Sequence, residues 1–411
     1  MSALGTLGLD AARAVDPARY PIAGAAPRAA LRPATREEVA EALKAATREG
    51  LAVAPWGGGA GLAREDALPR YDLALDLTAL DRIVEYDPED LTLTAECGVT
   101  IATLRATLGA RGQELPLEAP HAARATLGGV LAANASGSRR LRLGSPRDRI
   151  LGARFALADG TLARTGGKVV KNVAGYGIHR MLCGSRGALA VILEASLKLL
   201  PAPGKRVALM FGASAKEIAD PARWTRFPRL EPAVLTVLGR ASAARLAGGA
   251  PRAEFAVIVG LEDDARWVEQ QEATVTAALA APARRIEDGE AEALWQALCD
   301  LEDGAGPQVT LATADNTPAA LAPLLDQPEA AGLSFHAPHG RLLLDASPER
   351  AAALVPKLAA AGFALVAARG SRVEPALPPQ SGLLALRQRI RDALDPTRRL
   401  AFGARWVAGS I

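Results

Sequence analysis

The sequence has few cysteines. Its 411 residues include only Cys97, Cys183 and Cys299, and no two of them form a C-x-x-C pair. Such wide separation argues against a self-contained iron–sulfur cluster and against a cysteine-based zinc site. Isolated thiols are typical of reducing compartments, where cysteine behaves as a small apolar residue. We therefore expect three buried, unlinked thiols, no metal site and a cytoplasmic protein.

Aromatic residues and unbalanced charge are also scarce. Aromatics make up 4% of the chain, and the formal net charge is +3 with both signs mixed along the sequence. Nucleic-acid-binding proteins usually carry a basic face or a set of stacking aromatics, so no nucleic-acid partner is expected. The longest apolar stretch, residues 351–368, is interrupted by Pro356, Lys357 and Gly362. The sequence therefore predicts no membrane span, and its first residues lack the pattern of a signal peptide.

Glycine, by contrast, is concentrated in three short segments of the N-terminal half. Residues 55–62 read PWGGGAGL, residues 126–137 read TLGGVLAANASG, and residues 183–189 read CGSRGAL. Positions without side chains leave backbone N–H groups open to an anion, and phosphate is the usual one. A single loop of this kind is often only a tight surface turn. Three in order indicate one long, phosphate-bearing ligand, and a dinucleotide fits that description.

Neither of the two common nucleotide-binding motifs is present. A Rossmann G-x-G-x-x-G motif starting at Gly57 or Gly59 would need its third glycine at Leu62 or Arg64. A Walker A loop ends in Gly-Lys-Ser/Thr, but here Gly167-Lys168 is followed by Val169. The glycine loops therefore belong to another kind of nucleotide site.

The sequence around these loops predicts a mixture of helices and strands. A capping box at residues 35–38 begins a helix that ends at Gly50, and Asp159-Gly160 marks the turn of a hairpin. The prolines of residues 201–204 mark a domain boundary. Beyond it, predicted helices at 264–280, 290–300, 318–326 and 348–361 accompany predicted strands at 254–260, 308–314, 341–346 and 363–368. This pattern indicates an α+β second domain.

The motifs together resemble a known family. In order they are WGGGAGL, TLGGVLAANASG, GSPRDRILG, ADGT, KNVAGYG and GSRGALAVI. This series resembles the FAD-binding domain of the vanillyl-alcohol oxidase, or PCMH, type, and most of all the smaller flavin-binding subunit of bacterial glycolate oxidase. The resemblance implies an α+β fold with a two-subdomain FAD-binding domain at residues 1–204. An α+β cap domain for substrate or interface would follow at 205–380, and a C-terminal segment, 381–411, would pack back on the FAD-binding domain.

The resemblance also implies which residues hold the cofactor. Relatives with covalent flavin often carry histidine where this chain has Ala60, so noncovalent FAD is expected. Backbone N–H groups of the first two loops would bind the pyrophosphate, Ser136 and Gly137 would pass close to the flavin, and the third loop would pack on the adenosine or ring edge. The expected FAD-binding residues are Trp56, Gly57, Gly58, Gly59, Ala60, Gly61, Leu62, Pro120, Thr126, Leu127, Gly128, Gly129, Ser136, Gly137, Ser145, Arg147, Asp148, Gly187, Ala188, Leu189 and Ile192.

Catalytic residues are harder to assign. Hydride transfer from a 2-hydroxy acid needs a cation for the carboxylate and a base for the hydroxyl proton. The candidates near the expected flavin face are Tyr176, His179 and Lys171. Arg140 can hold a carboxylate or can simply be solvated. The pair in residues 336–339, HAPH, is interpreted as a turn before a strand and not as a metal site.

The resemblance implies a function within a complex. The chain would be the FAD-binding subunit of a glycolate oxidase, a 2-hydroxyacid dehydrogenase that oxidises glycolate to glyoxylate and passes electrons through flavin to an iron–sulfur partner. Its partners would be a larger FAD-binding subunit and an iron–sulfur subunit, with a peripheral location at the inner face of the membrane through them. Two alternatives remain: an autonomous FAD-dependent, D-lactate-type dehydrogenase, and a non-catalytic scaffold subunit.

Overall fold

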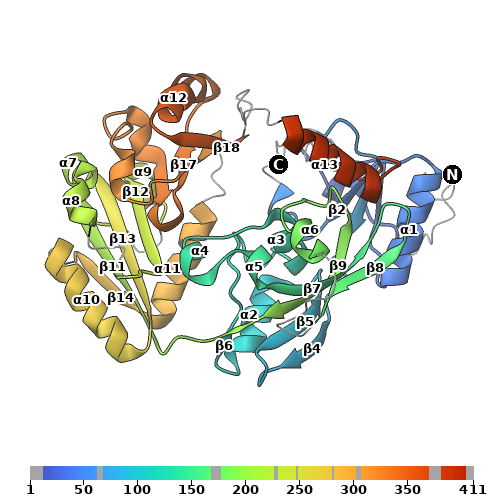
Figure 1. Ribbon diagram of the computed structural model, residues 1–411, viewed down its shortest axis with the longest axis horizontal. Helices are drawn as coiled ribbons and strands as arrows, with labels where there is room; N and C mark the ends of the chain where they lie inside the picture. Colours follow the sequence, from blue (N-terminus) through green and yellow to red (C-terminus); the bar gives the residue numbers. More distant parts are fainter. Residues whose placement is uncertain are drawn as a thin grey trace. The chain divides into compact units, whose positions relative to one another are not determined.

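The chain forms two compact units, which Figure 1 shows with their helices and strands labelled. Unit 1 comprises residues 1–135, 145–202 and 378–411, and unit 2 comprises residues 136–144 and 203–377. The computed structural model describes residues 13–62, 68–167, 177–225, 230–246, 249–279, 282–301, 307–369 and 381–403. The short segment 136–144 is thus separated in sequence from the rest of unit 2.

Within the described residues, unit 1 contains a parallel sheet of order β1-β3-β2, an antiparallel sheet of order β4-β5-β9-β7-β8, and the pair β10-β6. The strands are β1 (Ala29–Leu31), β2 (Val53–Trp56), β3 (Leu73–Asp76), β4 (Ile83–Asp87), β5 (Thr92–Glu96), β6 (Gln113–Glu114), β7 (Ile150–Ala156), β8 (Leu162–Gly166), β9 (Val191–Lys198) and β10 (Leu200–Pro201). The helices are η3 (Pro17–Arg19), α1 (Arg36–Arg48), α2 (Ile101–Gly109), α3 (Leu127–Ala133), α5 (Pro146–Arg149), α6 (Ile178–Leu182) and α13 (Ser381–Leu394).

Helix α1 follows the sequence signals closely. The Thr35 side chain accepts a hydrogen bond from the Glu38 N–H, and Val39, Leu43 and Ala46 are buried on the inner face. Spacing of three and four residues places these apolar side chains together against the strands of the parallel sheet. The predicted helix is confirmed. After α1 the chain forms β2, which runs directly into the first glycine loop.

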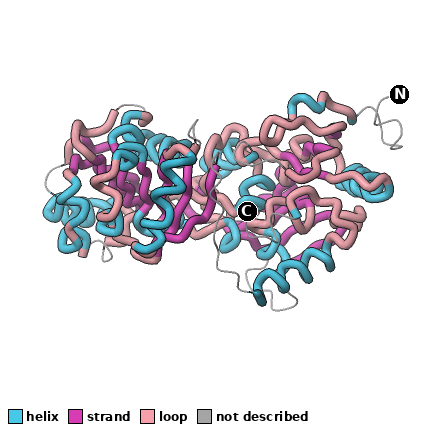
Figure 2. Tube along the Cα trace, turned by 90° about the horizontal axis from the view of Figure 1, so that it is seen from above, coloured by secondary structure: helices cyan, strands magenta, loops and turns pink. Residues whose placement is uncertain are grey.

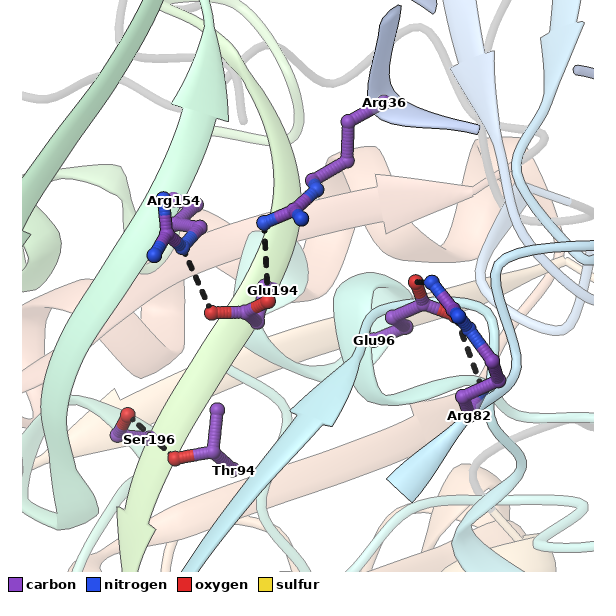
Figure 3. Close-up of polar contacts among 7 residues, drawn as sticks. All are labelled: Arg36, Arg82, Thr94, Glu96, Arg154, Glu194 and Ser196. Carbon is purple, nitrogen blue, oxygen red and sulfur yellow. Dashed lines mark hydrogen bonds and ion pairs between the residues drawn. The ribbon is translucent and has the colours of Figure 1, made fainter. Parts of the chain in front are cut away.

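Acidic side chains tie the elements of unit 1 together, as Figure 3 shows. Glu194 of β9 accepts a hydrogen bond from Arg36 of α1 at 3.3 Å and from Arg154 of β7 at 3.0 Å. Glu96 of β5 forms an ion pair with Arg82 at 2.7 Å. The Glu194 contacts link α1, which covers the parallel sheet, to the antiparallel sheet.

Residues 399–402 of the C-terminal segment pair with β2 of unit 1. The Val53 N–H donates to the Arg399 carbonyl at 2.7 Å, and the Ala401 N–H donates to the Val53 carbonyl at 2.9 Å. Phe402 is 1% exposed and packs in a core with Trp56 and Tyr20. Residues 399–402 therefore support the strand that precedes the first glycine loop.

In its described residues, unit 2 is built on an eight-stranded sheet of order β14-β11-β13-β12-β16-β17-β15-β18, in which every pairing is antiparallel. Its strands are β11 (Lys205–Ala213), β12 (Val234–Gly239), β13 (Phe255–Asp263), β14 (Arg284–Glu287), β15 (Gln308–Thr313), β16 (Leu333–His336), β17 (Arg341–Asp345) and β18 (Phe363–Arg369). Its helices are α4 (Arg140–Leu143), α7 (Ala215–Ala219), α8 (Pro221–Trp224), α9 (Arg240–Ala244), α10 (Ala265–Leu279), α11 (Asp288–Asp300), η7 (Pro318–Leu321), η8 (Pro328–Gly332), η9 (Ala337–His339) and α12 (Pro348–Ala360).

Both faces of this sheet are covered by helices, which Figure 2 draws in cyan beside the magenta strands. Val207 and Leu209 of β11 share one core with residues of α10 and α12, whereas Ala208 and Met210 share another with residues of α11. Alternate side chains of a strand point to opposite faces, so the helices lie on the two sides of the sheet. The helix predicted at residues 318–326 is wrong, because only η7 forms there and turns follow it.

Candidate functional site

The first glycine loop packs tightly against the chain that precedes α3. A Cβ atom added at Gly57 would lie 2.2 Å from the Thr126 Oγ1 atom. At Gly58 it would lie 1.6 Å from the carbonyl oxygen of Arg124, which is a backbone atom. Real Cβ atoms essentially never approach heavy atoms within 3.0 Å. These two positions therefore require glycine for steric reasons.

The second loop is the start of α3. The Thr126 side chain caps this helix by accepting a hydrogen bond from the Gly129 N–H at 3.3 Å. The Gly128 N–H donates to the Cys97 carbonyl at 2.8 Å, and a Cβ at Gly128 would lie 2.8 Å from the Cys97 Cβ. The second loop is thus in close contact both with the first loop and with the end of β5.

The third loop approaches the first from another side. Gly187 has a φ of +76°, and a Cβ added there would lie 2.9 Å from the Pro55 Cγ. The Arg186 N–H donates to the Ala132 carbonyl of α3 at 2.8 Å. Glycine at 187 is required both by its left-handed backbone and by this close approach. The three glycine segments, distant in sequence, meet in unit 1.

A small cavity of about 50 Å³ lies where the loops meet. It is too small for a whole dinucleotide, since ligand pockets usually measure about 300–1,000 Å³, but it has room for a small anionic group. Seven of the expected FAD-binding residues line it, namely Trp56, Gly57, Thr126, Gly128, Gly129, Gly187 and Ile192. The sequence did not indicate the others, which are Pro55, Leu77, Cys97, Ala132, Arg186, Ala190 and Val191.

The remaining expected residues lie at varying distances from this cavity. Five expected residues of the first loop do not line the cavity, namely Gly58, Gly59, Ala60, Gly61 and Leu62. Four expected residues outside this loop do not line the cavity either, namely Pro120, Leu127, Ala188 and Leu189. Ser145 and Asp148 form the capping box of α5, and the Arg147 N–H donates to the Asn134 side chain at 3.2 Å. These contacts hold the turn that follows α3. Ser136 and Gly137 belong to unit 2.

Trp56 anchors the first loop. It is 8% exposed and packs edge-on against Tyr20, with ring centroids 5.3 Å apart. The Tyr20 hydroxyl donates to Asp76 at 2.7 Å, which attaches the pair to β3. Gly59, with a φ of +73°, turns the loop over the indole ring of Trp56. A Cβ atom added at Gly59 would lie 3.3 Å from that ring. The first residue of the loop is therefore fixed by the packing of Trp56 against Tyr20.

Of the candidate catalytic residues, Tyr176 and Lys171 lie outside the described residues. His179 is buried in α6, with its Nδ1 atom 3.5 Å from the Thr165 Oγ1 of β8. Burial, together with the nearby charge of Arg180, lowers the pKa of His179 below its usual value. The ring is neutral near pH 7 and packs between α6 and β8.

A basic cluster in unit 2 was not apparent from the sequence. Arg140 donates to the Ser136 hydroxyl at 2.7 Å, and Arg341 donates to the Ser136 carbonyl at 3.3 Å. The His336 and His339 rings stack with centroids 5.6 Å apart, and His336 Nδ1 lies 2.9 Å from the Thr236 hydroxyl. These residues come together through the β16–β17 hairpin and the packing of α4 on η9.

His339 is the unusual member of this cluster. Both of its ring nitrogens are buried, with no hydrogen-bond partner within the described part of the chain. Burial, followed by the positive charges of His336, Arg341 and Arg140, lowers the pKa of His339 to about 2. The ring is therefore neutral at physiological pH, with one N–H donor and one acceptor. Residues 337–339 form a 3₁₀ turn before β17, which confirms the turn and strand predicted there.

The three cysteines are free and buried, as expected from the sequence. Burial raises the pKa of Cys183 to about 12, and burial, with a contribution from Glu194, raises the pKa of Cys97 well above its usual value. Both are protonated thiols at neutral pH. We expect a thiol reagent such as Ellman's reagent to react slowly with the native protein and to find three thiols after unfolding in denaturant. Rapid reaction of one thiol in the folded protein, measured as an absorbance burst, would contradict this placement.

Two properties of the residues with described positions bear on metal binding and on membranes. Among them no group of three or more histidine, cysteine, aspartate or glutamate side chains is arranged to hold a metal ion. None of the helices found there is both long and apolar enough to cross a membrane.

Known proteins resemble this chain mainly in the region of the site. Residues 27–166 match the family described as FAD binding domain. The chain is 42% identical over 156 residues to the glycolate oxidase subunit GlcE of Escherichia coli (strain K12), covering 38% of this chain and 45% of that protein. It is 31% identical over 199 residues to the glycolate oxidase subunit GlcD of Bacillus subtilis (strain 168), covering 47% of this chain and 42% of that protein.

A third relative is the D-lactate dehydrogenase of Archaeoglobus fulgidus, 36% identical over 181 residues, or 43% of this chain and 40% of that protein. The chain thus spans less than half the length of these curated relatives. A solved structure of alkyldihydroxyacetonephosphate synthase has a similar fold, with a TM-score of 0.66 over 92% of this chain and 76% of that one, at 17% identity. The solved structure confirms the predicted α+β fold, and the family match shows that residues 27–166 are similar to an FAD binding domain.

Proposed function

We propose that the chain is the FAD-binding subunit of a glycolate oxidase, a 2-hydroxyacid dehydrogenase. The observation that carries this proposal is the meeting of three glycine segments around one cavity, where Cβ atoms would collide with neighbouring atoms. Two of the segments fall within residues 27–166, the part that matches the FAD binding domain. The names of the glycolate oxidase subunits among the relatives support the choice of reaction.

The glycine loops would hold FAD without a covalent bond. Ala60 stands in the first loop and has no group that can form a bond to flavin. At Gly57, Gly128 and Gly129, which line the cavity, no side chain blocks the approach of the pyrophosphate. The N–H groups of Gly128 and Gly129 already donate within the protein, to the Cys97 carbonyl and the Thr126 hydroxyl. The full set of residues expected from the sequence to contact FAD remains part of this proposal. When bound, FAD accepts the hydride that the substrate gives up.

Unit 2 supplies groups suited to the carboxylate of a small acid. Arg140 and Arg341 converge on Ser136, and guanidinium groups bind carboxylates through paired hydrogen bonds. The neutral ring of His339 offers a hydrogen-bond donor or a hydrogen-bond acceptor beside them. A 2-hydroxy acid presents a carboxylate and a hydroxyl, which are the two groups that this cluster can bind.

The partners in the proposal are a larger FAD-binding subunit and an iron–sulfur subunit. With three separate cysteines, the chain has no cysteine set for a cluster of its own, so electrons leaving the flavin need another carrier. We place the complex in the cytoplasm, peripheral to the membrane through its partners. An autonomous dehydrogenase is the second candidate, and similarity to a D-lactate dehydrogenase favours it.

Anaerobic reduction of bound flavin separates these candidates. We expect the isolated chain to bind FAD but to be reduced slowly by glycolate or D-lactate, and the chain purified with its native partners to be reduced quickly by glycolate. Loss of the visible flavin absorbance after mixing measures both rates. Fast reduction of the isolated chain would contradict the subunit proposal and establish the autonomous dehydrogenase.

A further inference from the structure

Arg186 lines the same cavity as the glycine loops. It lies in the third glycine segment and has a φ of +50°, in the left-handed region that arginine seldom adopts. Gly187 follows with a φ of +76°. Two successive left-handed residues form a sharp turn, and the Arg186 side chain projects from this turn.

The backbone on both sides of Arg186 is firmly held. Its N–H donates to the Ala132 carbonyl of α3 at 2.8 Å. Before it, the fully buried Ser185 donates from its hydroxyl to the Leu182 carbonyl at 2.8 Å. After it, Gly187 packs against Pro55 at the end of β2. The unusual conformation is therefore fixed by the same elements that position the glycine loops.

Charge makes this position distinctive. Of the described residues that line the cavity, Arg186 alone carries a formal charge, and the others are apolar residues, glycines, one threonine and one cysteine whose burial raises its pKa. Glycine loops bind an anion with N–H dipoles. A guanidinium adds a full positive charge and paired donors with the geometry of two phosphate oxygens.

We propose that the Arg186 guanidinium binds the pyrophosphate of FAD and gives the site its selectivity for phosphorylated flavins. This goes beyond the proposed function, and it rests on that function only in requiring that FAD binds. Arg186 would act as a binding residue for the cofactor, with no part in the transfer of the hydride.

The test compares a flavin that carries a pyrophosphate and adenosine with one that carries neither. Dissociation constants for FAD and for riboflavin, which has no phosphate, are measured by fluorescence for the natural chain and for Arg186→Asn and Arg186→Lys. Asparagine tolerates a left-handed backbone, so Arg186→Asn removes the charge without straining the turn. Arg164→Asn, an exposed arginine of β8, is the matched control for net charge.

We expect Arg186→Asn to weaken FAD binding by about tenfold or more, the effect of losing hydrogen bonds to a charged group. Riboflavin binding should not change, Arg186→Lys should recover part of the loss, and the salt dependence of FAD affinity should become shallower in Arg186→Asn. Equal losses for FAD and riboflavin, or natural FAD affinity in Arg186→Asn, would overturn the inference. A natural chain that binds no FAD would instead refute the proposed function.

Discussion

Replacing Gly58 with alanine is expected to abolish FAD binding and to lower the stability of unit 1. The new methyl group would lie 1.6 Å from the Arg124 carbonyl oxygen, so one of two backbone segments must move. Insertion of bulk into a well-packed site typically costs about 1–3 kcal/mol, and a collision with backbone lies at the upper end. Such a movement would shift the first glycine loop relative to Thr126, and residues of both segments line the cavity. Titration with FAD and thermal unfolding measure the two effects.

Two other alanine substitutions serve as controls for Gly58→Ala. Gly109, at the end of α2, and Gly61, in the first loop, both have open space where a Cβ would be placed. Gly109→Ala should keep natural stability and natural FAD affinity. Gly61→Ala should keep stability, and any loss of FAD affinity would then come from contact with the cofactor. Natural affinity and stability in Gly58→Ala would show that the packing of this loop is not as described.

The second large effect is expected at Glu262, in unit 2. Its side chain is 1% exposed and forms ion pairs with Arg139 at 3.0 Å, Arg142 at 3.4 Å and Arg206 at 3.9 Å. Arg139, 5% exposed, also lies over the Trp295 ring at 5.2 Å. Glu262→Ala leaves positive charge buried beside β13 without its carboxylate. Removing one partner of a buried pair costs about 3–5 kcal/mol, so unit 2 should unfold at clearly lower denaturant concentration.

The neighbouring residue provides the matched control. Asp263 is 42% exposed and pairs with Arg142 at 3.1 Å. An exposed pair of this kind contributes about 0–1 kcal/mol, so Asp263→Asn should change the free energy of unfolding little. Urea unfolding monitored by circular dichroism compares the two variants. Equal free energies of unfolding would contradict the account, in which Glu262 holds Arg139 and Arg142 of segment 136–144 through buried ion pairs.

Local signals in the sequence predicted much of unit 1 correctly. Helix α1 and the β7–β8 hairpin depend on a cap, a spacing and an Asp-Gly turn, all of which act over a few residues. Strand β11 was not predicted, because helices cover both faces of its sheet and its sequence has no apolar–polar alternation. The helix predicted at 318–326 failed because Pro323 removes a backbone donor and disfavours helix in the residue before it.

The candidate site shows the same division. Glycines at 57, 128 and 187 were predicted as parts of phosphate-binding loops, and in the structure they line the cavity and pack closely against neighbouring chain segments. Cys97 and Arg186 were not, since they reach the cavity only through the folding of β5 and the third loop. The convergence of Arg140 and Arg341 on Ser136 likewise joins residues about 200 positions apart, which no local pattern encodes.

Visible absorbance of the purified chain titrated with FAD tests the central claim most directly. The glycine loops predict a yellow protein that binds one FAD per chain and releases it on denaturation, because no covalent bond holds it. A chain that is colourless, and that leaves the spectrum of added FAD unchanged, would contradict the account.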